Sequence, residues 1–132
     1  MREIKFRAWD KTAKQMYQVD ELGIGKYDWQ QYAKGDKQPK TGKNKFYPSQ
    51  VEINQNTGLR DKNGVEIYEG DIVMFDYEWT KPTEIGVITW NKDNASFQIK
   101  GHIPSFSMKH LNQMKVVGNI YENNELLRKE GK

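Results

Sequence analysis

The chain has 132 residues and a formal net charge of +3, with 36% hydrophobic residues, 30% charged residues and no cysteine. This length predicts one domain that buries roughly two-thirds of its unfolded surface, and the lack of cysteine excludes disulfides, thiolate zinc sites and a thiol nucleophile. The net charge is too small to indicate nucleic-acid binding by itself, and no apolar stretch reaches the ~18 residues of a membrane span. We therefore expect a soluble, cytoplasmic protein without an export signal.

The N-terminal residues show the alternation of a half-buried strand. Ile4, Phe6 and Ala8 alternate with the side chains between them. A polar turn follows over residues 10–14, and residues 15–19 supply a partner strand. The sequence therefore predicts an N-terminal hairpin.

The next segment, from Gly23 to Pro48, is rich in lysine. Its six lysines and two aspartates give a local charge of +4, so all the excess positive charge of the chain lies here. Scattered glycines and prolines predict a long irregular connection. Its aromatic residues, among them Trp29, Tyr32, Phe46 and Tyr47, indicate that parts of it fold back onto the body, because pure linkers rarely carry them. Residues 27–33 can form a short helix with Asp28 as its cap.

The stretch from Asn56 to Phe75 packs two turns and two strands into twenty residues. Within it, the sequence DKNG at residues 61–64 predicts a tight primed hairpin turn, because Asn and Gly tolerate positive φ angles. The runs at residues 65–68 and 72–75 have strand length and composition, and residues 69–71 form a turn between them. We expect the hydrophobic core to lie here.

Strands continue to the end of the chain. Residues 85–90 and 95–100 predict a second hairpin around the turn at 91–94, and residues 116–121 predict the closing strand. A short helical turn is expected at 107–111, and a final helix at 124–128 with Asn123 as its cap. The fold class is thus mainly β, with antiparallel strands, short helices and a long irregular lysine-rich segment. The element order from Gly70 to Tyr121 is that of a small SH3-like barrel, and an α+β domain with an open antiparallel sheet is the alternative.

Four segments carry a resemblance to a known family. They read KFRAWD at 5–10, TGLRDKNG at 57–64, IYEGDIV at 67–73 and VGNIYEN at 117–123. In their order along the chain and in their sequences, these segments resemble the YopX family of bacteriophage and prophage proteins. The resemblance implies a phage-borne, β-rich protein with an SH3-like barrel and without an established activity. The four segments bracket nearly the whole chain but leave out residues 23–48, about which the resemblance says little. We expect a single YopX-like domain over 1–132, with a hairpin and basic segment at 1–55, a barrel part at 56–123 and a short helical tail at 124–132.

The case for an enzyme is weak. Six acids fall within nineteen residues and can in principle bind magnesium or act in acid-base catalysis, but turn positions and strand edges explain them more simply. They are Glu66, Glu69, Asp71, Asp76, Glu78 and Glu84. Asp71 follows Gly70 and is expected to accept bonds from backbone amides in a turn. The two histidines, His102 and His110, have no ligand spacing, and no nucleophile elbow or phosphate loop is present. We expect no catalytic residue, metal or cofactor.

Binding is the better hypothesis. Lysines can neutralise phosphates, and exposed aromatic rings can stack on bases. A peptide groove lined by aromatic residues is a second possibility beside the loop that follows Phe75. The candidate binding residues are Lys26, Trp29, Tyr32, Lys34, Lys37, Lys40, Lys43, Lys45, Tyr77 and Trp79. Trp90 also flanks that loop, but the simpler interpretation places Trp90 in the core with Trp79 covering it.

The sequence therefore predicts a non-enzymatic binding module. A host or phage protein is the favoured partner, and nucleic acid bound by the lysine-rich segment 26–45 is the first alternative. The second alternative is a structural homo-oligomer that assembles through strand edges of the N-terminal hairpin or through residues 23–48. No membrane partner is expected.

Overall fold

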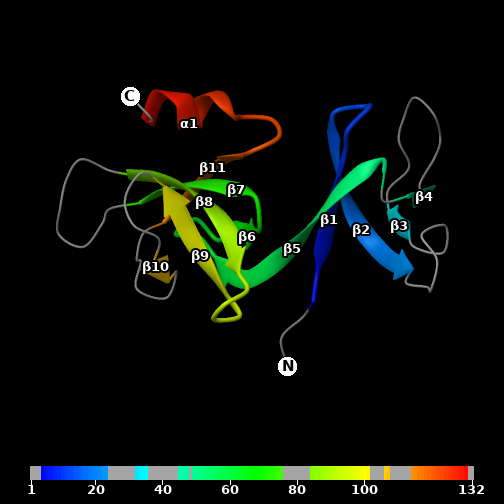
Figure 1. Ribbon diagram of the computed structural model, residues 1–132, viewed down its shortest axis with the longest axis horizontal. Coiled ribbons are helices and arrows are strands. Elements are labelled where there is room, and N and C mark those ends of the chain that lie inside the picture. The colour runs from blue at the N-terminus through cyan, green and yellow to red at the C-terminus, as the bar shows by residue number, and fades with distance from the viewer. Residues whose placement is uncertain are drawn as a thin grey trace. The chain divides into compact units, whose positions relative to one another are not determined.

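The computed structural model describes residues 4–23, 32–35, 45–47, 49–75, 84–101, 106–107 and 114–130. These residues form eleven strands and one short helix, and all strand pairs are antiparallel. The predicted mainly β class is confirmed. The chain divides into two compact units, Glu3–Gln55 and Asn56–Lys132, which contain the elements drawn in Figure 1.

The first unit is an antiparallel sheet with the strand order β4-β3-β2-β1-β5. Its strands are β1 (Phe6–Asp10), β2 (Gln15–Gly23), β3 (Tyr32–Gly35), β4 (Lys45–Phe46) and the first half of β5 (Val51–Arg60). The predicted N-terminal hairpin is confirmed. Its turn is held by the Asp10 carboxylate, which accepts the N–H groups of Thr12 and Ala13 at 2.9 and 3.1 Å. Lys14 completes the turn with a φ of 56° and donates its N–H to the Asp10 carbonyl.

Parts of the lysine-rich segment fold onto this sheet, as expected from its aromatic content. Ala33 lies opposite Leu22 on one side and Phe46 on the other, and it is only 3% exposed. The predicted helix over 27–33 is therefore wrong at Tyr32 and Ala33, which belong to β3. Strand pairing and burial override the local preference there. The rest of that predicted helix, with Asp28, lies outside the described residues.

The core of the first unit lies on one face of the sheet. Ala8, Tyr17, Phe46 and Val51 are buried together, and Val19 packs against them. The rings of Tyr17 and Phe46 stack with centroids 5.6 Å apart. Among the described residues of this core, two aromatic rings supply much of the buried area.

The second unit contains the second half of β5, which pairs with β6 (Glu66–Tyr68), and a sheet with the order β10-β9-β8-β7-β11. The strands of that sheet are β7 (Asp71–Phe75), β8 (Glu84–Asn91), β9 (Ser96–Gly101), β10 (Phe106–Ser107) and β11 (Lys115–Asn119). Within the described residues β10 and β11 do not pair with each other, so the predicted closed SH3-like barrel is not confirmed. Ser107 is in a strand rather than in the predicted helical turn, whose other residues lie outside the described ranges.

The core of the second unit gathers Ile67, Val73, Phe75, Ile88, Ile99 and Met114, with Phe97 and Val116 packed against it. The helix α1 (Glu125–Glu130) follows and contacts β8. The predicted helix is thus confirmed, but Asn123 does not cap it as expected. Its side-chain oxygen instead accepts the N–H of Asn119 at 3.1 Å and holds the preceding turn.

Candidate functional site

The stretch from Asn56 to Phe75 carries most of the resemblance, and its polar residues hold turns. The hairpin between β5 and β6 is confirmed, but its turn is not the predicted primed type, which needs positive φ at both central residues. Among the turn residues 61–64 only Gly64 has a positive φ, at 82°, and its N–H donates to the Asp61 carbonyl. This arrangement fits a three-residue hairpin loop that ends in a left-handed glycine.

The Asp61 carboxylate is the centre of this turn. It is 7% exposed, and it accepts the N–H groups of Asn63 and Val65 within the hairpin and of Val116 on β11, at 2.8, 2.9 and 3.0 Å. Burial raises its pKa, but those three donors and the nearby Lys115 charge lower it more, so the pKa lies below its ordinary value. The Asp61 side chain therefore ties the hairpin turn to β11 as an anion.

The same turn also covers the outer edge of β11. Lys62 donates its N–H to the Met114 carbonyl at 3.0 Å, beside the bond from Val116 to Asp61. Unpaired strand edges invite pairing with another chain, and covering them is one way in which proteins avoid it. This part of the β11 edge is thus occupied by the chain itself.

Three other polar residues of the stretch also form hydrogen bonds with backbone groups. Asn56 accepts the N–H of Gly58 at 2.6 Å, and the Thr57 hydroxyl donates to the Ile67 carbonyl at 2.8 Å. Asp71 accepts the N–H of Tyr68 at 2.8 Å, which confirms its predicted role in a turn. The side chains that make this motif distinctive are therefore engaged with backbone groups.

The acidic cluster at 66–84 does not form a metal site in the part of the chain that is described. Glu66 forms an ion pair with Arg60 at 3.5 Å, and Asp71 holds the turn described above. No group of three acidic or histidine side chains within the described ranges is arranged to hold a metal ion. Asp76 and Glu78, together with His102 and His110, lie outside those ranges.

Of the predicted binding residues, only Tyr32, Lys34 and Lys45 fall in described ranges. Tyr32 donates its hydroxyl to Glu21 at 2.8 Å, and this bond is the largest of the effects that raise its pKa. Its ring also lies against Gly23, where an added Cβ would approach it to 2.0 Å. One face of the Tyr32 ring is therefore already used within the sheet.

The two lysines lie opposite each other. Lys34 is exposed on β3, with Lys45 opposite it on β4 and Glu21 opposite it on β2. The structure thus brings together Tyr32, Lys34 and Lys45 at one edge of the sheet. The other predicted binding residues lie outside the described ranges: Lys26, Trp29, Lys37, Lys40, Lys43, Tyr77 and Trp79.

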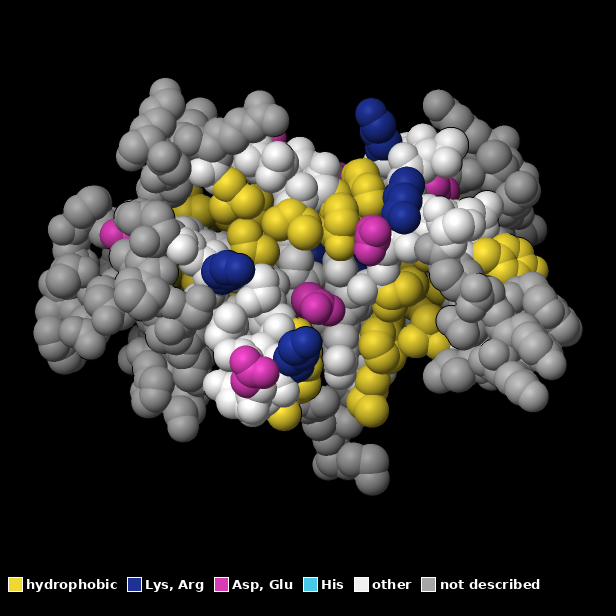
Figure 2. Space-filling model, in the orientation of Figure 1, with side chains coloured by type: hydrophobic (Ala, Val, Ile, Leu, Met, Phe, Trp, Pro, Cys, Tyr) yellow, Lys and Arg dark blue, Asp and Glu magenta, His cyan; other side chains and the backbone are white. Residues whose placement is uncertain are grey.

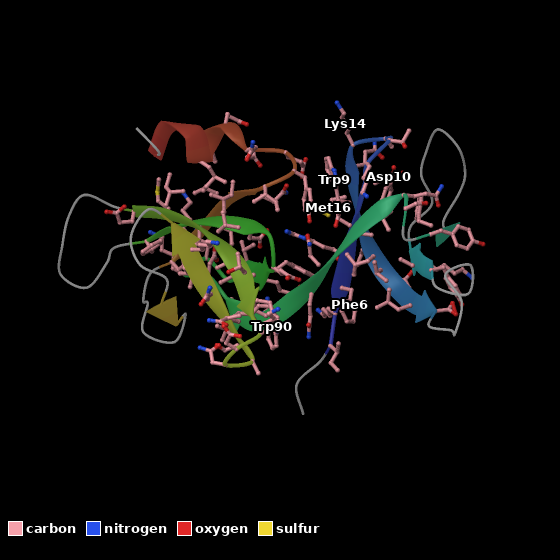
Figure 3. All side chains as sticks on the ribbon, viewed as in Figure 1. Phe6, Trp9, Asp10, Lys14, Met16 and Trp90 are labelled. Carbon is pink, nitrogen blue, oxygen red and sulfur yellow. The ribbon has the colours of Figure 1, made fainter. Side chains whose placement is uncertain are left out.

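Trp90 is exposed, and the prediction that it belongs to the core is wrong. Its side chain is 46% exposed at the end of β8, next to the turn into β9 (Figure 3). It packs edge-to-face on Phe97, with ring centroids 5.0 Å apart. Ile88, two residues earlier on the same face, is fully buried. The sequence does contain an indication of this exposure. Trp90 is the last residue of the apolar alternation and stands directly before the turn at 91–94.

The hairpin that carries Trp90 is well fixed. Six residue pairs join β8 to β9, from Gly86 and Gly101 to Asn91 and Ser96. At its tip, Asn91 donates its side-chain N–H to Gln98 at 2.9 Å and accepts the N–H of Asp93 at 2.9 Å. Between residues 84 and 101 two acids and two lysines balance, so the hairpin has no net charge. It presents a large aromatic ring from a neutral, ordered support.

These features define a class: a mainly β protein of two antiparallel units, with turns held by side-chain bonds and an exposed tryptophan on one hairpin. The chain belongs to the YopX protein family, which matches residues 5–128. It is also similar to the crystal structure of protein EF1440 from Enterococcus faecalis, with 28% identity and a TM-score of 0.68 over 96% of this chain and 99% of that one. No curated protein matches the chain. Within the described residues, no helix is long and apolar enough to span a membrane.

Proposed function

We propose that the protein is a non-enzymatic binding module for a host or phage protein, encoded by a phage or prophage and acting in the cytoplasm of the bacterial host. The exposed Trp90 on the β8–β9 hairpin carries the proposal and is its principal anchor. We also propose that the strands of the second unit belong to an SH3-like barrel. Burial of both faces of β7 supports the barrel, because Ile72 and Val73 are each fully buried.

The arrangement around Trp90 suits recognition of a protein. Tryptophan is among the residues that contribute most to binding energy at interfaces, where it fills a pocket of the partner. The edge-to-face contact with Phe97 restrains the Trp90 ring, and the bond from Asn91 to Gln98 holds the two strands beneath it. Restraint before binding lowers the entropy lost on association. The neutral hairpin favours a protein over a nucleic acid, whose phosphates require an excess of positive charge.

The engagement of the acidic residues supports a non-enzymatic role. A general base or metal ligand needs an oxygen that can reach a substrate or an ion. Asp61 and Asp71 use their oxygens on backbone N–H groups, and Glu66 pairs with Arg60. Asp61 and Asp71 thus hold turns, and Glu66 pairs across two strands.

Nucleic-acid binding by residues 26–45 is a second candidate. The cross-strand placement of Lys34 and Lys45 favours it, because two lysines at one sheet edge raise the local positive charge. Glu21 lies opposite Lys34 on β2, and its negative charge weighs against nucleic-acid binding at this place. This candidate predicts binding that weakens steeply with salt, whereas an apolar anchor such as Trp90 predicts a weak dependence on salt.

The test is affinity capture from a bacterial host lysate with the full chain as bait. Wild type, Trp90→Ala and Val65→Ala are compared by quantitative mass spectrometry after nuclease treatment. Val65 is the matched control because it is an apolar residue, 48% exposed, on another hairpin of the same unit. We expect a protein that wild type and Val65→Ala retain and that Trp90→Ala loses by tenfold or more.

Equal capture by all three proteins contradicts the proposal. Capture that nuclease abolishes, or that falls steeply between low and high salt, favours the nucleic-acid candidate instead. A circular dichroism spectrum of Trp90→Ala that matches wild type excludes unfolding as the cause of a loss.

A further inference from the structure

The loop of the β5–β6 hairpin contains a reactive dipeptide, Asn63–Gly64. Both residues are exposed, and no other asparagine of the chain precedes a glycine. Asparagine is among the thermolabile residues of proteins, and the amide carbon of its side chain lies within reach of the next main-chain nitrogen. Glycine hinders attack by that nitrogen least, and among the described residues nothing lies within 4 Å of a Cβ added at Gly64. Solvent therefore has access to the dipeptide.

The reaction open to this dipeptide is deamidation through a cyclic imide. The Gly64 nitrogen gives up its proton to hydroxide and bonds to Cγ of Asn63, and the bond from Cγ to the side-chain nitrogen breaks. That nitrogen takes a proton from water and leaves as ammonia, so a five-membered imide ring remains. Water then opens the ring at either carbonyl carbon. Addition at Cγ gives aspartate at position 63, and addition at the main-chain carbonyl gives isoaspartate, in which the chain continues through Cγ.

The folded turn holds the dipeptide away from the geometry of that ring. Gly64 donates its N–H to the Asp61 carbonyl at 3.0 Å, so the proton that must leave is hydrogen-bonded. Neither Lys62 nor Asn63 has a positive φ, which makes residues 61–64 a type I turn with ψ of about 0° at Asn63. In the imide ring, the Gly64 nitrogen instead eclipses Cβ of Asn63 about the Cα–C bond. Cyclisation therefore requires a rotation that breaks the bond from Gly64 to Asp61.

Three further bonds keep the turn closed. Asn63 and Val65 donate their N–H groups to the Asp61 carboxylate at 2.8 and 2.9 Å. Arg60 donates from its guanidinium group to the Gly64 carbonyl at 2.9 Å. These bonds lie on both sides of the peptide bond between residues 63 and 64. Because cyclisation needs an open turn, its rate in the folded protein scales with the fraction of molecules in which the turn is open.

We propose that Asn63 is a modification site, at which the side-chain amide is lost when the turn opens, and that the isoaspartate product releases the turn from β11. Water is the only other reactant. Isoaspartate adds one carbon atom to the main chain between residues 63 and 64, so the loop that Gly64 closes onto Asp61 no longer has its native length. This inference does not depend on Trp90 or on the function proposed above.

The product acts on the edge of β11 that the turn covers. The bond from Val116 to Asp61 and the bond from Lys62 to Met114 both depend on the closed loop. Acidic and basic side chains are interspersed among the described residues on the face shown in Figure 2. The new carboxylate, in contrast, stands two residues after the buried Asp61 anion, and like charges close together disfavour each other. Modification is therefore expected to free the Val116 amide and uncover this edge.

The first test compares the folded and the unfolded chain. Wild type is incubated at mildly alkaline pH in buffer and in urea, and mass spectrometry of the peptide that contains Asn63 follows its conversion. Electron-transfer fragmentation distinguishes isoaspartate from aspartate. We expect conversion to be at least ~10-fold slower in the folded protein. Equal rates, or no conversion in urea, overturn the proposal.

The second test opens the turn by substitution. Asp61→Ala removes the carboxylate bonds and is expected to raise the rate in the folded protein at least ~10-fold. Ile99→Ala is the matched control, because it removes a side chain from the core and leaves the turn bonds in place. Circular dichroism establishes that each variant is folded. Equal acceleration by both variants assigns the reaction to global unfolding and overturns the role of the turn.

The third test examines the product. The isoaspartate form, separated by ion exchange, is expected to exchange the Val116 amide hydrogen at least ~10-fold faster than the unmodified protein. Asn63→Asp carries the same charge without the added carbon atom and is expected to have a smaller effect. Unchanged exchange in the isoaspartate form overturns the release of β11, and equal exchange in Asn63→Asp overturns its assignment to chain length.

Discussion

The bond network of Asp61 makes the sharpest prediction for stability. A hydrogen bond to a charged group contributes ~1.5–3 kcal/mol, and a buried donor left without a partner costs a similar amount. The Asn63 N–H lies in an exposed turn where water replaces the carboxylate, which leaves the bonds from Val65 and Val116. Asp61→Ala is therefore expected to lower the free energy of unfolding by ~3–5 kcal/mol.

Asp61→Asn separates the two bonds. The amide keeps one oxygen, which can still accept the Val65 N–H within the hairpin. It replaces the oxygen that faces Val116 with an NH2 group, so two donors then oppose each other. We expect Asp61→Asn to lower the free energy of unfolding by ~1.5–3 kcal/mol and to raise amide hydrogen exchange at Val116 selectively.

The pH dependence of this difference has a definite sign. The pKa of Asp61 in the folded protein lies below the value of 3.8 for the unfolded chain. The unfolded state therefore binds the proton more readily between these two values, and stability rises with pH there. The contribution is complete above pH 3.8 and is lost as the pH falls through the folded pKa. Wild type and Asp61→Asn should thus converge in acid.

Urea denaturation at a series of pH values, with hydrogen exchange of the Val116 amide as the local probe, measures both effects. Other carboxylates titrate in both proteins, so the difference between wild type and Asp61→Asn isolates Asp61. A difference below ~0.5 kcal/mol at pH 7, the range of ordinary surface substitutions, would refute this account. So would a difference that stays constant from pH 7 to pH 3.

Three further predictions follow from local contacts. Thr57→Ala removes two hydroxyl bonds and should cost ~1–2 kcal/mol in urea denaturation, whereas Thr57→Ser should retain most of the stability. Glu21→Gln should lower the ionisation midpoint of Tyr32 toward 10.0 in an ultraviolet difference titration against Tyr32→Phe, and an unchanged midpoint contradicts the assigned cause. Gly118→Ala brings a Cβ to 2.4 Å from the Asn123 side chain and should cost ~1–3 kcal/mol, and Asn123→Ala in the same chain should recover part of that loss if the clash is its cause.

Most strands could be predicted from local sequence, because an alternation of apolar residues marks each strand and polar turn residues mark its end. The alternation at residues 4–9 and 85–90, with polar turn residues after each, corresponds to β1 and β8. The short strands β3 and β4 have no such pattern. They are defined by the pairing of β3 with β2, the pairing of β4 with β3, and the burial of Ala33 and Phe46, and these are tertiary effects that local propensity does not contain.

The candidate site was harder to predict for the same reason. The turn role of Asp71 depends on a residue three positions away and could be inferred, whereas the bond from Val116 to Asp61 joins residues 55 positions apart. Trp90 has the composition of a core residue, and only its place at the end of β8 leaves it exposed. Apolar alternation identifies the face of a strand, but the extent to which that face is covered depends on tertiary packing.

The segments that place this chain in its family therefore need not contain its binding site. Asn56, Thr57, Asp61 and Asp71 bond to backbone groups, and replacing them is expected to destabilise the second unit. A loss of function in such variants would reflect fewer folded molecules and would be mistaken for loss of a contact. Trp90 differs because its exposed ring can be removed while the turn bonds remain. A loss of binding by Trp90→Ala at unchanged stability would separate recognition from folding.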